Sequence, residues 1–162
     1  MDYIYGHDEI VARFVGQLIP AVGEHGFGPH KTFGVLDDDN HLIAGMVYHN
    51  YDPKAGIIEM SGAALPGTRW VTPETLARMY QYPFLQLGCQ MVVMRVAADN
   101  ERLLRQLAAL NYMLIKVPRM FGREADGVLC LLTYEDWAAN KICRRFKHHL
   151  VRPEIHLGLE AA

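Results

Sequence analysis

The first third of the chain changes from a helical to an extended hydrophobic period. Residues 3–5 form a short apolar strand, and a polar start at residues 6–9 leads into a helix that Pro20 ends. Its apolar positions recur at helical spacing: Ile10, Val11, Phe14, Val15 and Leu18. Residues 20–31 are rich in Gly, Pro and His and have no period, which predicts a loop.

Three extended apolar segments follow the loop, at residues 32–36, 42–49 and 57–64. Polar turns at residues 37–40 and 52–56 separate them. Connections this short join antiparallel neighbours, so we expect a three-stranded meander.

The second half alternates between helices and strands. Thr72, Pro73 and Glu74 start a helix that reaches residue 87, with a kink at Pro83 because proline cannot donate to the preceding turn. A strand over residues 90–97 precedes a second helix capped at Asn100. The last strands are residues 112–117 and 128–133, joined by a loop that includes residues 122–127.

The predicted element order is β-α-β-β-β-α-β-α-β-β. This order indicates an α/β (α+β) fold: a mixed, mainly antiparallel sheet of six to seven strands with helices on both faces. Helical crossovers favour parallel pairing of the strands that they connect, at residues 57–64, 90–97 and 112–117. We assign residues 1–134 to one domain. Residues 135–162 form a helical, basic extension packed on it, with Trp137, Ile142 and Phe146 lining a short helix.

Composition narrows the function classes. The net charge of −2 gives no strong field for nucleic acid or acidic lipid. Three cysteines without CxxC spacing argue against disulfides and a zinc site, and the histidines lack metal-ligand spacing, so no metal is expected. We find no secretory signal and no apolar stretch of membrane length. These features predict a cytoplasmic protein without a membrane partner.

The order of elements and residues 73–114 resemble the GNAT (GCN5-related N-acetyltransferase) superfamily, in the manner of its small, divergent bacterial or phage members. Asn100 matches the Asn that follows the fourth core strand, and Asn111-Tyr112 stands where the family usually has Gly-Phe. Two positions depart from the family pattern. Trp70 replaces the central glycine of the pyrophosphate loop, and Leu107 replaces a tyrosine that acts as general acid.

The resemblance implies an acyl-CoA co-substrate, acetyl-CoA in most members, bound where two parallel strands splay apart. The pyrophosphate is then expected over the N-terminus of the 72–87 helix, where free N–H groups favour an anion and Arg69 adds a charge. An ordinary strand-to-helix connector explains the same loop. The residues that the resemblance assigns to the co-substrate are Ala63, Ala64, Leu65, Gly67, Thr68, Arg69, Trp70, Val71, Thr72 and Asn100, with Ala97 on the facing strand.

Three residues are candidates for proton transfer. Glu59 shares one strand face with Ile57 and Ser61, and a carboxylate in a partly dry cleft has a raised pKa suited to a base. His49, at the end of the preceding strand, is the second candidate, and Tyr112 is a candidate acid toward the leaving thiolate. Each has a plain structural alternative: an exposed glutamate, a surface histidine beside a turn and a core aromatic residue.

Three functions remain open on this sequence. The first is direct N-acylation of a primary amine, a small molecule or a peptide, held between the 20–31 loop, the Glu59 strand and the loop after Val117. The second is a catalytically weak or inactive binding protein on a GNAT scaffold, which the departures at Trp70 and Leu107 favour. The third is nucleic-acid contact through the basic residues 141–152, which the remaining acidic chain disfavours. The sequence is also compatible with a homodimer.

Overall fold

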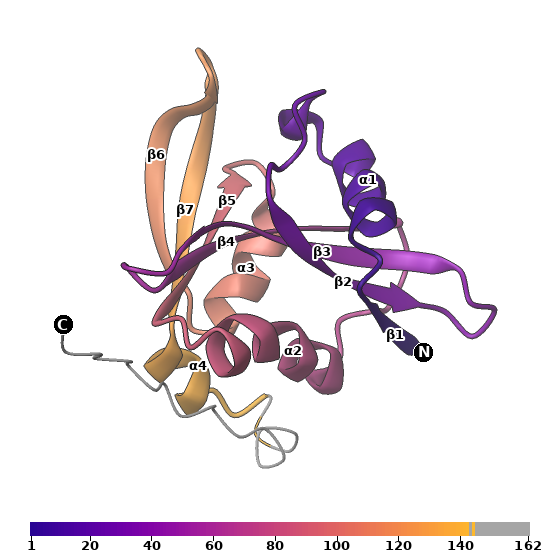
Figure 1. Cartoon of the computed structure of the whole chain (residues 1–162). Coiled ribbons are helices and arrows are strands. Elements are labelled where there is room, and N and C mark those ends of the chain that lie inside the picture. The colour runs from indigo at the N-terminus through magenta and orange to yellow at the C-terminus, as the bar shows by residue number, and fades with distance from the viewer. Residues whose placement is uncertain (143, 145–162) are drawn as a thin grey trace, which may run out of the picture.

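The molecule is built on one seven-stranded sheet, seen in a computed structural model that describes residues 1–142 and 144 (Figure 1). The strands are β1 (Asp2–Tyr5), β2 (His30–Leu36), β3 (Leu42–Asp52), β4 (Ile57–Ala64), β5 (Met91–Ala97), β6 (Met113–Gly122) and β7 (Ala125–Thr133). Their order across the sheet is β1-β2-β3-β4-β5-β7-β6, and among these described strands only β4 and β5 pair in parallel. The predicted mixed, mainly antiparallel fold is therefore confirmed.

Helices cover both faces of this sheet. The helices are α1 (Asp8–Leu18), α2 (Pro73–Tyr80), α3 (Glu101–Ala109) and α4 (Tyr134–Ala139), with a 3-10 turn at Pro20–Val22. Helix α1 packs on β2, β3 and β4, where it forms a small core with Val47. Helices α2, α3 and α4 pack on the opposite face and enclose the main core. The two faces of β4 thus have different neighbours.

Two details of the strand prediction were wrong. The strand predicted over residues 112–117 does not pair in parallel with the strand over residues 90–97, because β7 lies between β5 and β6 and pairs with both in antiparallel fashion. The last two strands are also longer than expected. They form a hairpin whose turn is Arg123 and Glu124, and the register shifts between Val117 and Gly122. Residues 125–127, expected in a loop, belong to β7.

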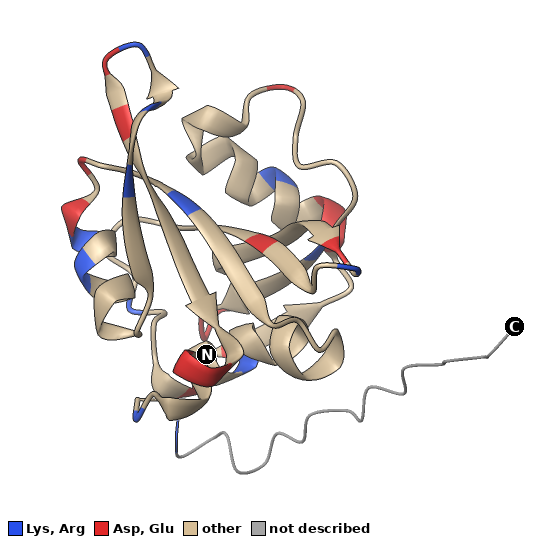
Figure 2. Cartoon of the chain, turned by 90° about the vertical axis from the view of Figure 1, so that its left-hand side faces the viewer, with Lys and Arg blue, Asp and Glu red and all other residues tan. Residues whose placement is uncertain are grey.

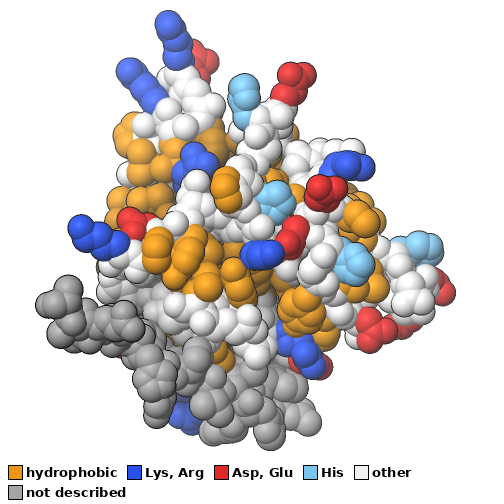
Figure 3. Space-filling view, viewed as in Figure 1, with side chains coloured by type: hydrophobic (Ala, Val, Ile, Leu, Met, Phe, Trp, Pro, Cys, Tyr) orange, Lys and Arg blue, Asp and Glu red, His pale blue; other side chains and the backbone are white. Residues whose placement is uncertain are grey.

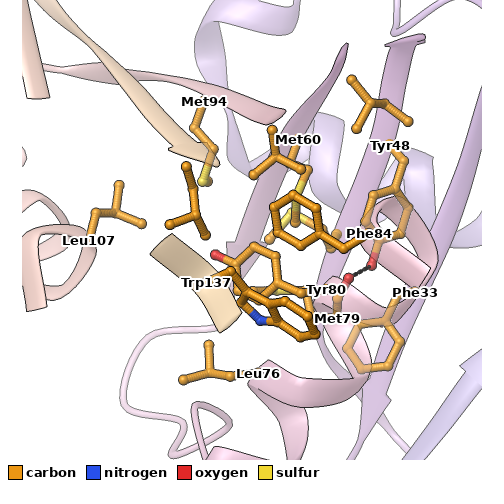
Figure 4. Packing of buried hydrophobic residues seen from close by; sticks show 14 of the residues in the cluster. Phe33, Tyr48, Met60, Leu76, Met79, Tyr80, Phe84, Met94, Leu107 and Trp137 are labelled. Carbon is orange, nitrogen blue, oxygen red and sulfur yellow. Dashed lines mark hydrogen bonds between the residues drawn. The ribbon is translucent and has the colours of Figure 1, made fainter. Parts of the chain in front are cut away.

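The main core is rich in aromatic side chains. Tyr80 and Phe84 lie within 6.4 Å of the Trp137 ring, centroid to centroid, and all three are almost fully buried (Figure 4). The Tyr80 hydroxyl lies 2.6 Å from the Tyr112 hydroxyl. Leu107 of α3 closes the core on the other side. These contacts join α2, α3 and α4 into one layer under the sheet.

The helix predicted over residues 72–87 begins and ends nearly as expected but changes type at its proline. After α2 the chain forms a π-helix, Gln81–Gln86, in which the Leu87 N–H donates to the Tyr82 carbonyl five residues earlier. Pro83 has no N–H for the Met79 carbonyl four residues earlier. The buried Tyr48 hydroxyl donates to that carbonyl instead, over 2.5 Å (Figure 4). A side chain of β3 therefore supplies the hydrogen bond that proline removes.

Helix α1 lies very close to the sheet. A Cβ at Gly45 of β3 would stand 2.8 Å from methyl carbons of Val11 and Val15, so the absence of a side chain allows this approach. Asp8, expected to favour the start of the helix, has another role. Its carboxylate accepts from the backbone N–H and hydroxyl of Thr32 and so ties α1 to β2.

The C-terminal part is described only as far as residue 144. Helix α4 falls in the predicted extension, and Trp137 belongs to the main core. Phe146 and most of the basic segment 141–152 lie outside the described residues, so the division at residue 134 and the nucleic-acid hypothesis stay predictions. Among the described residues, no helix combines the length and apolar composition needed to cross a membrane.

Candidate active site

The central feature of the candidate site is the separation of β4 from β5. The two strands pair only where Ile57–Glu59 face Met91–Val93. Beyond these three pairs, residues 60–64 of β4 and 94–97 of β5 have no partner across the gap, and Figure 1 shows the strands diverging. Unpaired backbone N–H and C=O groups along such an edge are available to an extended ligand.

A polar cluster lies at the point where the strands separate, on the face that carries α1. Strand registers put His49 opposite Glu59, and Glu59 beside Val93. Ser61 and Arg95 each follow two residues later on the same face, because side chains along a strand alternate. The structure thus brings together Glu59 and His49, two of the three predicted proton-transfer residues.

Glu59 is held by two donors. Its carboxylate accepts from Arg95 Nε over 2.7 Å and from Asn50 Nδ2 over 2.8 Å. Burial raises the pKa of Glu59, but the hydrogen bonds from Asn50 and Arg95 and the nearby charges outweigh it and lower the pKa overall. The sequence-based expectation was a raised pKa. Glu59 is therefore a stable carboxylate in this structure, and a weaker base than expected.

His49 is buried, where the sequence alternative was a surface histidine beside a turn. Its Nε2 lies 2.9 Å from Ser61 Oγ, and the Phe27 ring lies 5.1 Å from the imidazole. Burial lowers the pKa of His49, and the Glu59 charge opposes this without reversing it. A neutral imidazole joined to a hydroxyl is thus present beside the gap at neutral pH.

The third candidate, Tyr112, lies elsewhere. Its side chain is buried in the main core on the opposite face, where its hydroxyl contacts that of Tyr80. Burial raises the pKa of Tyr112 well above its ordinary value. The structure does not bring Tyr112 to Glu59 and His49, and its surroundings fit the alternative of a core aromatic residue.

The predicted pyrophosphate loop leads from β4 to α2. Residues 65–68 form a turn, in which Thr68 donates to the Leu65 carbonyl through its N–H and its hydroxyl, and Gly67 has a φ of 79°. Arg69 is exposed, whereas Trp70 is partly buried against the main core. Ala63 and Ala64 lie on the open part of β4, and the Leu65 N–H continues the pairing with β3.

The N-terminus of α2 offers fewer free donors than a typical helix. Pro73 has no N–H, and the Thr75 N–H donates to the Thr72 hydroxyl. Glu74 adds a carboxylate there, paired with Arg78 at 2.9 Å. An anion at this helix end would depend on the preceding loop and Arg69. Val71, next to Thr72, is exposed.

Asn100, the remaining candidate, caps α3. Its side chain accepts from the Leu103 N–H over 3.3 Å, as the capping prediction requires. Leu107, in place of the family's tyrosine, is buried in the main core. Neither Asn100 nor Leu107 therefore supplies a proton donor to the gap.

Two hollows of the described structure have no lining residue from β4 or β5. One, of about 330 Å³, is formed by α1 and the loop that follows it and is lined by Arg13, Glu24, Phe27 and His30 among others. The other, of about 270 Å³, lies between β1, β2 and α2. Phe27 lines the first hollow and also contacts His49, so this loop borders the polar cluster.

Three side chains in the β2–β3 turn have the composition of a cation site. Potential ligand atoms of Asp37, Asp39 and His41 lie within 4.8 Å of one another. The Asp37 carboxylate already accepts from the N–H groups of Asp39 and His41, as in an ordinary polar turn. This arrangement gives no support for a metal-dependent reaction.

Sequence reasoning missed Asn50 and Arg95, and named Ser61 only as a neighbour of Glu59. Alternation along β4 was enough to put Ser61 beside Glu59. The partners of Glu59 required the registers of two further strands, which no local pattern contains.

The comparisons with known proteins concern the fold. No protein-family model matches the sequence, and no curated protein matches it. Among solved structures, a chimera of the spermidine N-acetyltransferase SpeG from Vibrio cholerae and hSSAT has a TM-score of 0.67 at 13% identity, over 85% of this chain and 99% of that chain. A point mutant of Vibrio cholerae SpeG gives 0.68 at 13% identity, over 86% and 98%.

A probable acetyltransferase has a TM-score of 0.59 at 18% identity, over 68% of this chain and 64% of that chain. The TM-scores establish a common architecture, and identities this low leave the reaction open. The overall course of the chain agrees with these neighbours, as the TM-scores show. The chain has the fold of the GNAT N-acetyltransferases.

Proposed function

We propose that the protein is an acyl-CoA-dependent N-acyltransferase, with acetyl-CoA as the simplest co-substrate. The observation that carries this proposal is the gap between β4 and β5, which leaves two strand edges open within an otherwise paired sheet. Acetyltransferases with the same fold support it, among them spermidine N-acetyltransferases from Vibrio cholerae. The acceptor is an amine, which reaches the gap from the face that carries the polar cluster.

The open edges suit the amide-rich arm of the co-substrate. Residues 60–64 and 94–97 would hold this arm through backbone hydrogen bonds, and the loop with Arg69 would hold its diphosphate. The co-substrate supplies an activated acyl thioester. The protein's own residues then have to bind the amine, keep it neutral and receive its proton.

His49 and Ser61 suit the proton transfer better than Glu59 does. The acceptor nitrogen forms a bond to the acyl carbon while the carbon–sulfur bond breaks. The nitrogen releases one proton to Ser61 Oγ as the Ser61 hydroxyl proton passes to His49 Nε2. The leaving thiolate takes a proton from solvent. Glu59 stays ionised and orients the amine, because Arg95 and Asn50 stabilise its carboxylate.

A second candidate function is binding of acyl-CoA without transfer. Two observations favour it: Leu107 is buried where the family carries a tyrosine, and Tyr112 is bonded within the core. No acid for the leaving thiolate therefore reaches the gap from these two positions.

One experiment separates the two functions. Calorimetry measures acetyl-CoA binding, and release of free thiol is followed with a panel of primary amines. The enzyme proposal predicts binding together with amine-dependent thiol release that falls about a hundredfold in Ser61→Ala and His49→Gln. His41→Gln, in the exposed β2–β3 turn, is the matched control and should keep full activity. Binding without release supports the second function, and the absence of binding contradicts both.

A further inference from the structure

The position of Arg95 bears on the kind of amine that the gap accepts. Arg95 lies on β5, two residues beyond the last pair with β4, and its side chain is 52% exposed. Its strand partner is Leu129 of β7. A cation is therefore held where β4 and β5 begin to separate, beside the polar cluster.

Only one of the five N–H donors of Arg95 is used within the described part of the chain. Nε donates to Glu59, and among the described residues the two terminal NH₂ groups form no hydrogen bond or ion pair. Because Glu59 fixes one edge of the planar group, the remaining donors are held in a defined plane. Such a fork matches the two oxygens of a carboxylate.

The charge balance of the gap disfavours a polycation. Within the strands that border it, residues 57–64 and 91–97, Glu59 is the one acidic residue and Arg95 is the one basic residue. Their 2.7 Å ion pair leaves no net negative charge to attract a second ammonium group. Spermidine, the substrate named for the structural neighbours, carries several amines and no anionic group.

The surface next to Arg95 is apolar. Val93, Leu129 and Leu131 lie on the same face, because Val93 pairs with Leu131 and Arg95 with Leu129, and all three are partly exposed. Figure 2 shows few charged positions on the strands of this side, and Figure 3 shows hydrophobic side chains over β6 and β7. A ligand that places an anion at Arg95 would rest its remaining part on this surface.

We infer that the acceptor is an amino-carboxylate, a primary amine with a carboxylate next to it and an apolar remainder, and that Arg95 binds the carboxylate. This inference rests on the proposed acyl transfer. Glu59 and Ser61 receive the amino group, the terminal NH₂ groups of Arg95 receive the carboxylate, and the remainder lies on the β5–β7 surface. Arg95 is then a specificity-determining residue.

Matched acceptors test the inference, because each pair differs only by the carboxylate. Phenylalanine is compared with 2-phenylethylamine, leucine with 3-methylbutylamine, and spermidine serves as the polycation. We expect kcat/KM to be about ten- to a hundredfold higher for the amino acid of each pair, the usual range for a charge-assisted contact. In Arg95→Gln the ratio should fall to about one. Spermidine should improve in this variant, because Glu59 loses its cation.

The matched control is Arg123→Gln, which removes the same charge at the exposed turn of the β6–β7 hairpin and should keep the wild-type ratio. Binding of the same acceptors to the protein with acetyl-CoA is measured by saturation-transfer NMR, independently of turnover. Transfer with spermidine preferred, or an unchanged ratio in Arg95→Gln, overturns the inference and leaves the acyltransferase intact. Arg95-dependent binding of the amino acid without any transfer upholds the inference and overturns the proposed function.

Discussion

At the scale of single residues, the side chains of His49 and Glu59 beside the gap favour different protonation states. His49 is kept neutral by burial, and Glu59 is kept ionised by its donors Arg95 and Asn50. Groups whose environments separate their pKa values commonly divide the work of a reaction between them. In the proposed reaction, the imidazole of His49 accepts the proton and the carboxylate of Glu59 orients the amine.

The first prediction concerns the pH dependence of transfer. Because burial lowers the pKa of His49, the neutral form exists down to a pH below its ordinary value of 6.5. The rate should therefore rise with pH along a limb centred below 6.5 and then level off. In His49→Gln this limb should be absent. Ionisation of the acceptor amine affects both proteins alike, so the ratio of their pH–rate profiles isolates His49.

Stability provides an independent check of the same shift. An unfolded chain binds the proton more readily than the folded protein, so the free energy of unfolding should decrease as pH falls through 6.5 and stop changing below the folded pKa. Urea titrations at several pH values measure this difference between wild type and His49→Gln. Equal pH dependence in the two proteins would show that the pKa of His49 is unshifted.

At the scale of elements, local chemistry predicted several boundaries well, although it made β6 and β7 too short. Strand 57–64 has the predicted bounds, and Thr72 caps α2 with proline at the first helical position. At Pro83, where a kink was expected, the chain forms a π-helix. Each of these features depends on residues within one turn or one strand, and for this reason it could be predicted from the sequence alone.

A second prediction follows from the hydroxyl that replaces the helical donor. Tyr48→Phe leaves the buried Met79 carbonyl without its partner, which should cost about 1–3 kcal/mol in the free energy of unfolding. Urea denaturation measures the loss. Adding Pro83→Ala restores an N–H near this carbonyl, so the double variant should lose less than the sum of the two single variants. Additive losses would show that the hydroxyl and the proline act independently.

Local sequence patterns did not predict how strands distant in the sequence pair with one another. The insertion of β7 between β5 and β6 depends on a hairpin that folds back across the sheet, and the sequence around residues 118–124 resembles a loop. The partners of Glu59 come from the end of β3 and the middle of β5. Their convergence is a property of the register, which a single sequence does not display.

At the scale of the whole molecule, three residue pairs of β4 and β5 are the sheet's only link between β1–β4 and β5–β7 in the described chain. The aromatic core beneath the sheet joins the same halves from one side. Acetyl-CoA bound at the gap should therefore protect from hydrogen exchange those backbone N–H groups of residues 60–64 and 94–97 that point into the gap and do not pair with β3 or β7. Those of residues 57–59, already paired, should change little.

Exchange measured by mass spectrometry with and without acetyl-CoA tests this pattern, and the β6–β7 hairpin turn serves as an internal reference. Uniform protection across all strands would indicate general stabilisation by a ligand bound elsewhere. Protection confined to the loop after α1 would place the ligand in the neighbouring hollow.

The short β4–β5 ladder also has a kinetic consequence. Because β4 and β5 are not hydrogen-bonded to each other along the gap, a ligand can bind there and dissociate without breaking hydrogen bonds of the sheet. Its exchange rate is then set by side-chain motion around the opening and not by the slow global unfolding of the protein. Substitutions that weaken the aromatic core should shorten the lifetime of the folded state and leave the residence time of the bound ligand almost unchanged.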